Sequence, residues 1–150
     1  MFVSPRIAAA AAWALMWSLG ASAADFTPVG HWRTFSDKTG AQTGLIEITQ
    51  SGDEISGRIV KLIQEPGDPA DPICDKCDGP EKDQHMIGMT ILKGFRRDGD
   101  EWNGGTILDP RTGNHYNSEL RLDEDGNKLL VRGYMGLPIL GRTVTWVRGE

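Results

Sequence analysis

The stretch DPICDKCDGP, residues 71–80, contains the only two cysteines of the chain, Cys74 and Cys77. Their C-x-x-C spacing occurs in dithiol redox enzymes, in zinc sites and in plain disulfides, so three kinds of chemistry are open. A thioredoxin-like redox pair needs a helix N-terminus within a βαβ unit to lower the thiol pKa. The surrounding residues 64–88 carry four prolines and many charges and predict an irregular loop. Catalytic redox chemistry is therefore disfavoured.

The same cysteines could instead bind a metal or form a disulfide. A zinc site needs about four ligands, and a candidate set near the cysteines is Cys74, Cys77 and His85 with Asp75, Asp78 or Asp83. A disulfide formed on export is the favoured interpretation, because exported proteins meet an oxidising environment. Such a short closed loop would contribute about 2 kcal/mol or less to stability. We predict a Cys74–Cys77 disulfide, no metal and no cofactor, with zinc binding or free thiols as the alternatives.

Residues 1–23 have the pattern of a secretory signal peptide. Arg6 precedes an apolar run from Ile7 to Leu19, and Ala21-Ser22-Ala23 is the small-x-small pattern of a cleavage site. The run is shorter than the roughly 20 residues that a spanning helix needs. We expect cleavage after Ala23, a single domain over 24–150 without a membrane span, and a periplasmic or secreted location in a Gram-negative bacterium.

The charge balance makes two classes of partner improbable. The formal net charge is −5, and removing Arg6 with the signal peptide changes it to −6. Nucleic acids and anionic membrane surfaces reward clustered lysine and arginine, whereas the basic residues here are scattered. We expect neither a nucleic acid nor an anionic membrane surface as a partner.

The rest of the chain has the pattern of an all-β protein. Apolar residues alternate at period two, and turn residues recur at short intervals. The predicted strands are 30–35, 43–50, 54–63, 90–97, 101–108, 115–122, 128–134 and 142–148. Short Gly-, Asn- and Asp-containing links between most of them predict hairpins. We predict an antiparallel meander of about eight strands closed into a β-barrel, with one long Cys-containing loop, because closure removes the free edges of the sheet.

A barrel of eight strands can hold one small ligand in its interior. Strand alternation places Ile46 and Ile48 on one face, and Tyr116 and Leu120 on one face of a later strand. The candidate ligand-binding residues are Ile46, Ile48, Ile59, Leu108, Tyr116, Leu120 and Tyr134.

The two ends of the predicted barrel resemble the lipocalin arrangement. There, a Gly-x-Trp on the first strand closes the base of the barrel, and an arginine of the last strand lies across the tryptophan ring. The matching residues are Gly30, Trp32 and either Arg142 or Arg148. The residues predicted to close the barrel are Gly30, Trp32, Arg142, Trp146 and Arg148.

At larger scale the chain resembles the bacterial family catalogued as domain of unknown function 2147. The motifs that carry the resemblance are Gly88-Met89-x-Ile91-Leu92, Trp102-x-Gly104-Gly105-x-Ile107-x-Asp109-Pro110-x-x-Gly113-x-x-Tyr116, Val131-Arg132-Gly133-Tyr134-x-Gly136 and Gly141-Arg142-Thr143-x-Thr145-Trp146. The resemblance runs from Gly30 to the end of the chain. It implies an exported lipocalin-like barrel, and it brings no settled activity, cofactor or catalytic residue.

Catalysis is the least favoured function. The chain has no G-x-S-x-G or H-E-x-x-H motif, and we predict no catalytic residues. The one arrangement that could support acid–base chemistry is His115 with Asp109 and Tyr116, and His31 could meet His115 across the barrel.

Two binding functions remain. The favoured one is a barrel that binds a small apolar or amphipathic ligand. The alternative is a module that docks an envelope protein through the 64–88 and 135–141 loops. The 135–141 loop, MGLPILG, carries four apolar side chains. Whether it folds over the barrel mouth or is exposed to a partner separates the two hypotheses.

Overall fold

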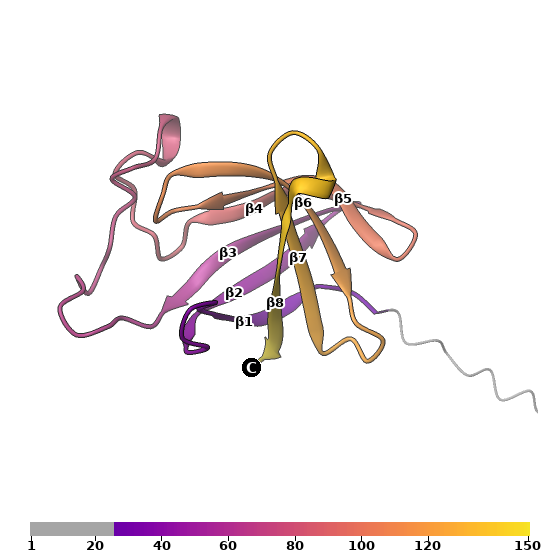
Figure 1. Cartoon of the computed structure of the whole chain (residues 1–150), viewed down its shortest axis with the longest axis horizontal. Helices are drawn as coiled ribbons and strands as arrows, with labels where there is room; N and C mark the ends of the chain where they lie inside the picture. Colours follow the sequence, from indigo (N-terminus) through magenta and orange to yellow (C-terminus); the bar gives the residue numbers. More distant parts are fainter. Residues whose placement is uncertain (1–25) are drawn as a thin grey trace, which may run out of the picture.

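The computed structural model describes residues 26–150, so the signal-peptide prediction lies outside the described residues. The strands are β1 (Gly30–Phe35), β2 (Gln42–Ser51), β3 (Glu54–Leu62), β4 (Thr90–Asp98), β5 (Glu101–Asp109), β6 (Asn114–Leu122), β7 (Lys128–Tyr134) and β8 (Arg142–Gly149) (Figure 1). Two 3₁₀ helices, η1 (Gly79–Glu81) and η2 (Pro138–Leu140), lie in loops. Each predicted strand is present, with ends within one residue of those expected.

The strands form a closed antiparallel barrel. Each strand pairs with the next in the chain, and β1 also pairs with β8, which leaves no free edge. The predicted fold class is therefore confirmed. Within residues 26–150, no helix has the length and the apolar character needed to cross a membrane.

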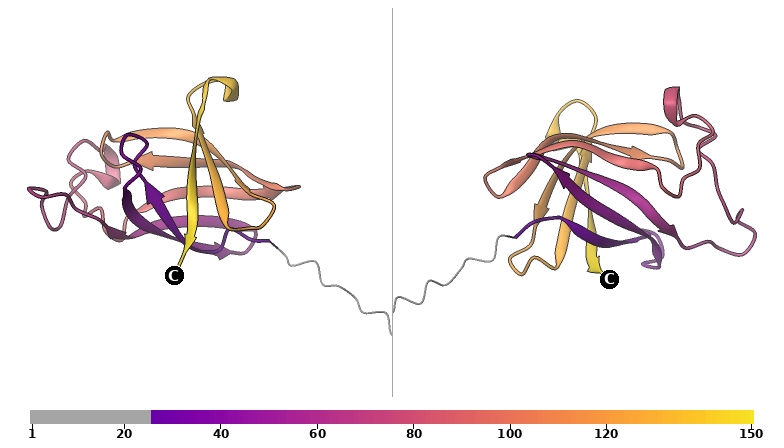
Figure 2. Two further views of the ribbon diagram at one scale, coloured as in Figure 1. Left: turned by 60° about the horizontal axis from the view of Figure 1, so that its bottom comes forward. Right: turned by 180° about the vertical axis from the view of Figure 1, so that it is seen from behind.

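The up-and-down order separates two ends of the barrel. The links 36–41, 63–89, 110–113 and 135–141 all lie at one end, which we call the mouth. The turns after β2, β4 and β6 lie at the other end, together with the segment that leads into β1 (Figure 2). We call this second end the base.

Trp32 fills the barrel at its base. Its side chain is 0% exposed, and its Nε1 donates a hydrogen bond of 2.7 Å to the Pro28 carbonyl. Arg148 is its partner across the β1–β8 pairing, and the guanidinium carbon lies 4.3 Å from the centre of the indole ring. This geometry is a cation–π contact. Of the two arginines that the sequence proposed for this role, Arg148 covers Trp32, and Arg142 lies at the mouth.

Arg148 also ties together the segments at the base. Its guanidinium donates hydrogen bonds to the carbonyls of Gly126, Val29 and Thr27. Gly30 has a φ of 130°, and a β-carbon on it would lie 3.1 Å from an Arg148 guanidinium nitrogen. Glycine in the G-x-W motif therefore provides both the backbone conformation and the room for the arginine.

Candidate functional site

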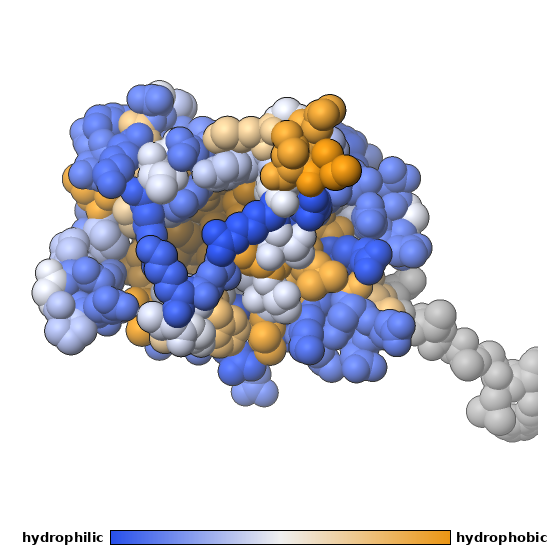
Figure 3. All heavy atoms as spheres, viewed as in Figure 1, coloured by the Kyte–Doolittle hydropathy of each residue, from blue (hydrophilic) through white to orange (hydrophobic). Residues whose placement is uncertain are grey.

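A cavity of about 420 Å³ lies inside the barrel and opens at the mouth. Figure 3 shows the hollow, with an apolar interior bordered by hydrophilic side chains. Its apolar walls are formed by Phe35, Ile46, Ile59, Leu62, Ile91, Ile107, Leu108, Pro110, Val131, Val144 and Trp146. Its polar lining comprises Thr34, Asp37, Thr43, Asp109, Arg111, Tyr116 and Arg142. The site thus combines an apolar interior with charged groups at its opening.

The structure brings four of the seven candidate ligand-binding residues together at this cavity. Ile46, Ile59, Leu108 and Tyr116 line it. Ile48 and Leu120 are fully buried in the packed core and do not line it. Both residues point inward, on the same strand faces as the cavity residues Ile46 and Tyr116. They differ from those residues in their position along the barrel axis, where the interior is filled.

Tyr134 lies on the outer face of β7. It pairs with the exposed Asn117, whereas the preceding Gly133 pairs with the buried Ser118 and lines the cavity. Because side chains alternate along a strand, Tyr134 points away from the interior.

The inward face of β8 supplies cavity residues beyond those predicted from the sequence to bind a ligand. Arg142, Val144 and Trp146 all line the cavity. Their spacing of two residues is the pattern of one strand face, so the signal was present in the sequence. The sequence instead predicts that Arg142 and Trp146 close the barrel.

Two arginines stand at the opening of the cavity. Arg142 forms an ion pair with Asp37, which connects the start of β8 to the β1–β2 link. Arg111 lies in the β5–β6 turn, and its side chain forms no ion pair or hydrogen bond within the described part of the chain. Asp109 accepts a hydrogen bond of 3.0 Å from the Arg111 backbone N–H. The opening therefore has one paired and one unpaired guanidinium group.

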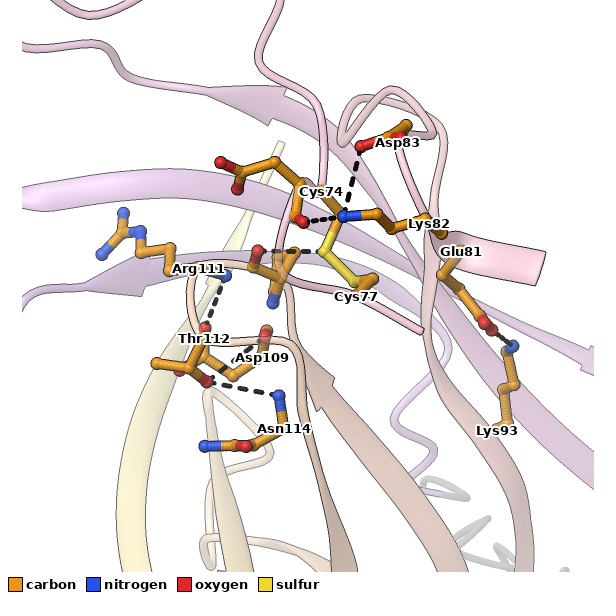
Figure 4. The surroundings of a disulfide bond; sticks show 12 residues. Cys74, Cys77, Glu81, Lys82, Asp83, Lys93, Asp109, Arg111, Thr112 and Asn114 are labelled. Carbon is orange, nitrogen blue, oxygen red and sulfur yellow. Dashed lines mark hydrogen bonds and ion pairs between the residues drawn. A yellow bond between two sulfur atoms is a disulfide. The ribbon is translucent and has the colours of Figure 1, made fainter. Parts of the chain in front are cut away.

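The 64–88 loop carries the Cys74–Cys77 disulfide that the sequence predicted. Both cysteines are buried, and Cys74 Sγ lies 3.1 Å from the Pro110 carbonyl oxygen (Figure 4). A disulfide sulfur carries no proton, so this is a packing contact and not a hydrogen bond. At Gly113, where φ is 76°, a β-carbon would lie 2.0 Å from the Lys76 carbonyl oxygen. The disulfide segment is thus packed against the turn that carries Arg111.

The 64–88 loop has internal order of its own. Ile73 and His85 form an isolated antiparallel bridge, and the Cys74 N–H donates to the Gln84 carbonyl at 2.8 Å. His85 Nδ1 lies 3.0 Å from an Asp71 carboxylate oxygen. Among residues 26–150, no cluster of three or more His, Cys, Asp or Glu side chains is placed to hold a metal ion. Because the two cysteines are joined in a disulfide, they do not provide the thiolate ligands that a zinc site at this position requires.

Replacing both cysteines with serine should lower the melting temperature only modestly, since the closed loop is short and the loss is about 2 kcal/mol or less. Limited proteolysis should show faster cleavage within 64–88, because the segment against Pro110 loses its cross-link. Thiol labelling of the denatured, unreduced wild type should find no free thiol. Full labelling of both cysteines would contradict the disulfide.

A second contact fixes this loop to the barrel wall. The Lys93 ammonium on β4 donates a hydrogen bond of 2.6 Å to the Glu81 carboxylate in η1. This hydrogen bond lowers the pKa of Glu81 below its ordinary value of 4.5. A carboxyl whose pKa is lower in the folded than in the unfolded protein stabilises the fold at any pH above its pKa in the unfolded chain. This contribution is lost as the pH falls through its pKa in the folded protein.

The Lys93→Met variant should therefore melt at a lower temperature than the wild type at neutral pH. The difference should shrink as the pH falls below 4.5, since Glu81 becomes protonated in both proteins. Thermal melts at matched ionic strength measure this difference. Lys38→Met, on an exposed residue of the β1–β2 link, is the control. A difference that stays constant with pH would show that the Glu81 charge is not involved.

The proposed acid–base arrangement is not assembled. Tyr116 lines the cavity, whereas the adjacent His115 is exposed and points to the other face of β6. His31 lies on β1 beside Glu47, at 3.9 Å. The alternation that separates neighbouring side chains on a strand thus keeps His115 away from Tyr116.

The 135–141 loop stands away from the barrel (Figures 1 and 2). Its apolar side chains are largely exposed, with Met135 at 56%, Leu137 at 64%, Ile139 at 82% and Leu140 at 76%. The Arg132 guanidinium donates two hydrogen bonds to the Pro138 carbonyl, at 2.6 and 3.1 Å, and holds the loop in this position. Figure 3 shows an apolar cluster protruding beside the hollow. The loop is exposed and does not fold over the mouth.

The barrel is similar to a solved structure described as protein HP1028 from the human pathogen Helicobacter pylori, which belongs to the lipocalin family. The two share 15% sequence identity, with a TM-score of 0.68 over 81% of this chain and 82% of that one. This similarity shows a lipocalin-like fold.

No curated protein matches the sequence. The family model described as "Uncharacterized protein conserved in bacteria (DUF2147)" matches residues 30–148. Since that match spans nearly the whole barrel, the chain belongs to this family.

Proposed function

We propose that this protein is an exported binding barrel for a small apolar or amphipathic ligand. The observation that carries the proposal is the cavity of about 420 Å³, with apolar walls and an opening to solvent. Small-molecule sites are typically concave, mostly apolar and about 300–1,000 Å³ in volume. A barrel interior filled completely by side chains would have no such role.

Export is part of the proposal. The signal-peptide pattern over residues 1–23 supports it, and so does the buried Cys74–Cys77 disulfide, because disulfides persist mainly in oxidising compartments. Cell fractionation should find the protein in the periplasm or medium, with a mass that corresponds to a chain beginning at Ala24. A cytosolic protein of full-length mass would contradict export.

The binding proposal is tested with the purified mature protein and an apolar fluorescent probe. A fluorescent fatty acid or Nile red should bind saturably, with one probe molecule per chain. Native mass spectrometry of protein purified from the periplasm should detect a co-purified small molecule. If neither the fluorescent fatty acid nor Nile red binds, the proposal is overturned.

One observation favours a second function, the docking of an envelope protein. The 135–141 loop exposes four large apolar side chains, and the 64–88 loop at the same end of the barrel exposes Ile73 and Ile87. Exposed apolar clusters of this kind mark interaction sites. The partner would carry an apolar patch facing the mouth, because both loops belong to that end.

The double variant Ile139→Ser and Leu140→Ser tests docking. Both side chains are exposed, so the free energy of unfolding should change by about 0.5 kcal/mol or less per site. The ligand cavity should keep its affinity for the probe, because neither residue lines it. A stoichiometric complex with one purified envelope protein should be lost in this variant and kept in Lys38→Ser. A complex that survives the double variant would exclude the loop as the docking site.

A further inference from the structure

We propose that the ligand is a single-chain amphiphile with an anionic head group, which Arg111 and Arg142 bind at the mouth while the tail occupies the apolar cavity. This inference rests on the proposed binding function and specifies its ligand. Arg111 and Arg142 come from different parts of the chain, the β5–β6 turn and the start of β8, and both line the same cavity.

The four charged side chains of the lining, Asp37, Asp109, Arg111 and Arg142, have no net charge, but they leave one guanidinium group without a partner among the described residues. Asp37 pairs with Arg142, and Asp109, which keeps its charge, accepts the Arg111 backbone N–H. The Arg111 guanidinium has no side-chain partner within residues 26–150. A guanidinium has five N–H donors in a planar fork that matches carboxylates and phosphates. An anion is therefore the head group that this opening favours.

Most of the interior wall is apolar, which places a charged head group at the mouth. The two threonine hydroxyls of the lining, Thr34 and Thr43, hydrogen-bond to each other at 2.8 Å. The Tyr116 hydroxyl accepts a hydrogen bond of 3.4 Å from the Asn114 side-chain amide, so its own O–H is free to donate. The remaining walls are apolar, and an unpaired charge among them would lose its hydration without compensation.

Asp37 then acts as an internal competitor for Arg142. Both side chains of this ion pair are exposed to solvent, at 72% for Arg142 and 45% for Asp37, and exposed pairs contribute little to stability. An incoming anion can therefore share or replace the Asp37 carboxylate. Removing the Asp37 charge should strengthen anion binding, which no purely structural role of Asp37 predicts.

The experiment compares three competitors with the same alkyl chain: decanoate, decanol and decylamine. Each displaces Nile red from the mature protein at neutral pH and low ionic strength. Decanoate should bind about tenfold more tightly than decanol, because hydrogen bonds to charged groups are the stronger ones. Decylamine should bind most weakly. Added salt should reduce the advantage of decanoate and leave decanol unchanged.

Single substitutions locate the head-group site. Arg111→Gln and Arg142→Gln should each weaken decanoate binding by about threefold to tenfold and leave decanol binding unchanged. Asp37→Asn should tighten decanoate binding by a few-fold. The control is Arg121→Gln, an exposed arginine on β6 that does not line the cavity. Melting temperatures confirm that each variant is folded.

The outcomes separate this inference from the binding function on which it rests. Equal affinity for the three competitors would overturn the anionic head group and leave the binding barrel intact. Tighter binding of decylamine than of decanoate would likewise overturn the anionic head group and leave the binding barrel intact. A loss of decanol and decanoate affinity together in both Arg111→Gln and Arg142→Gln would show that the arginines shape the cavity and do not bind the head group. Failure of Nile red to bind at all would overturn both proposals.

Discussion

Replacement of Trp32 with alanine should lower the free energy of unfolding by about 3–5 kcal/mol, the range for buried Trp→Ala changes. The indole is 0% exposed, so its removal leaves a cavity at the base that the surrounding strands cannot fill by small movements. The Arg148 guanidinium would lose the ring that it covers. Since small domains are stable by only about 5–15 kcal/mol, this single change should remove a large fraction of the stability. Urea titration followed by far-UV circular dichroism measures it.

Two further variants make the Trp32 result specific. Trp32→Phe loses the hydrogen bond to the Pro28 carbonyl but keeps an aromatic ring in the core. It should therefore lower the free energy of unfolding by less than Trp32→Ala does. Ile139→Ala removes a large apolar side chain from an exposed position and should change the free energy of unfolding by about 0.5 kcal/mol or less. A loss below about 1 kcal/mol in Trp32→Ala would be incompatible with a buried residue that closes the barrel.

Replacement of Val144 with tryptophan should reduce probe affinity more than about tenfold while the protein stays folded. Val144 lines the cavity and is only partly buried, so a larger side chain can extend into the open volume. The probe would then compete with the indole for the same space. Nile red titration measures the affinity, and circular dichroism checks the fold.

Val147→Trp is the matched control for this experiment. Val147 lies on the same strand, is also partly buried and does not line the cavity. The control should retain probe binding. Ile48 is not a suitable position, because it is already packed on all sides and a larger residue there would destabilise the barrel by about 1–3 kcal/mol. Equal binding by Val144→Trp and the wild type would place the probe outside the cavity.

Local patterns in the sequence were enough to predict the strands and their order. Alternation at period two and turn residues such as Asp98-Gly99 and Asp125-Gly126 act over a few neighbouring residues, so they can be recognised without knowledge of the rest of the fold. The short links then predict antiparallel neighbours, and the need to remove free edges predicts closure. The C-x-x-C disulfide is likewise local, because its cysteines are separated by three positions.

Tertiary structure alone decided what each inward-facing or charged residue does. Ile46 lines the cavity whereas Ile48, two residues along the same face, is packed in the core, since strand stagger and tilt set where the side chains leave space. Pairing of β1 with β8 places Arg148 opposite Trp32. Arg142 precedes Arg148 by six residues on β8. Because a strand rises by about 3.3 Å per residue, Arg142 lies at the other end of the barrel. Arg111 stands at the same opening because its turn joins β5 to β6 at the mouth, and the disulfide segment, far away in sequence, packs against that turn. These placements depend on contacts between distant segments, which no local pattern contains.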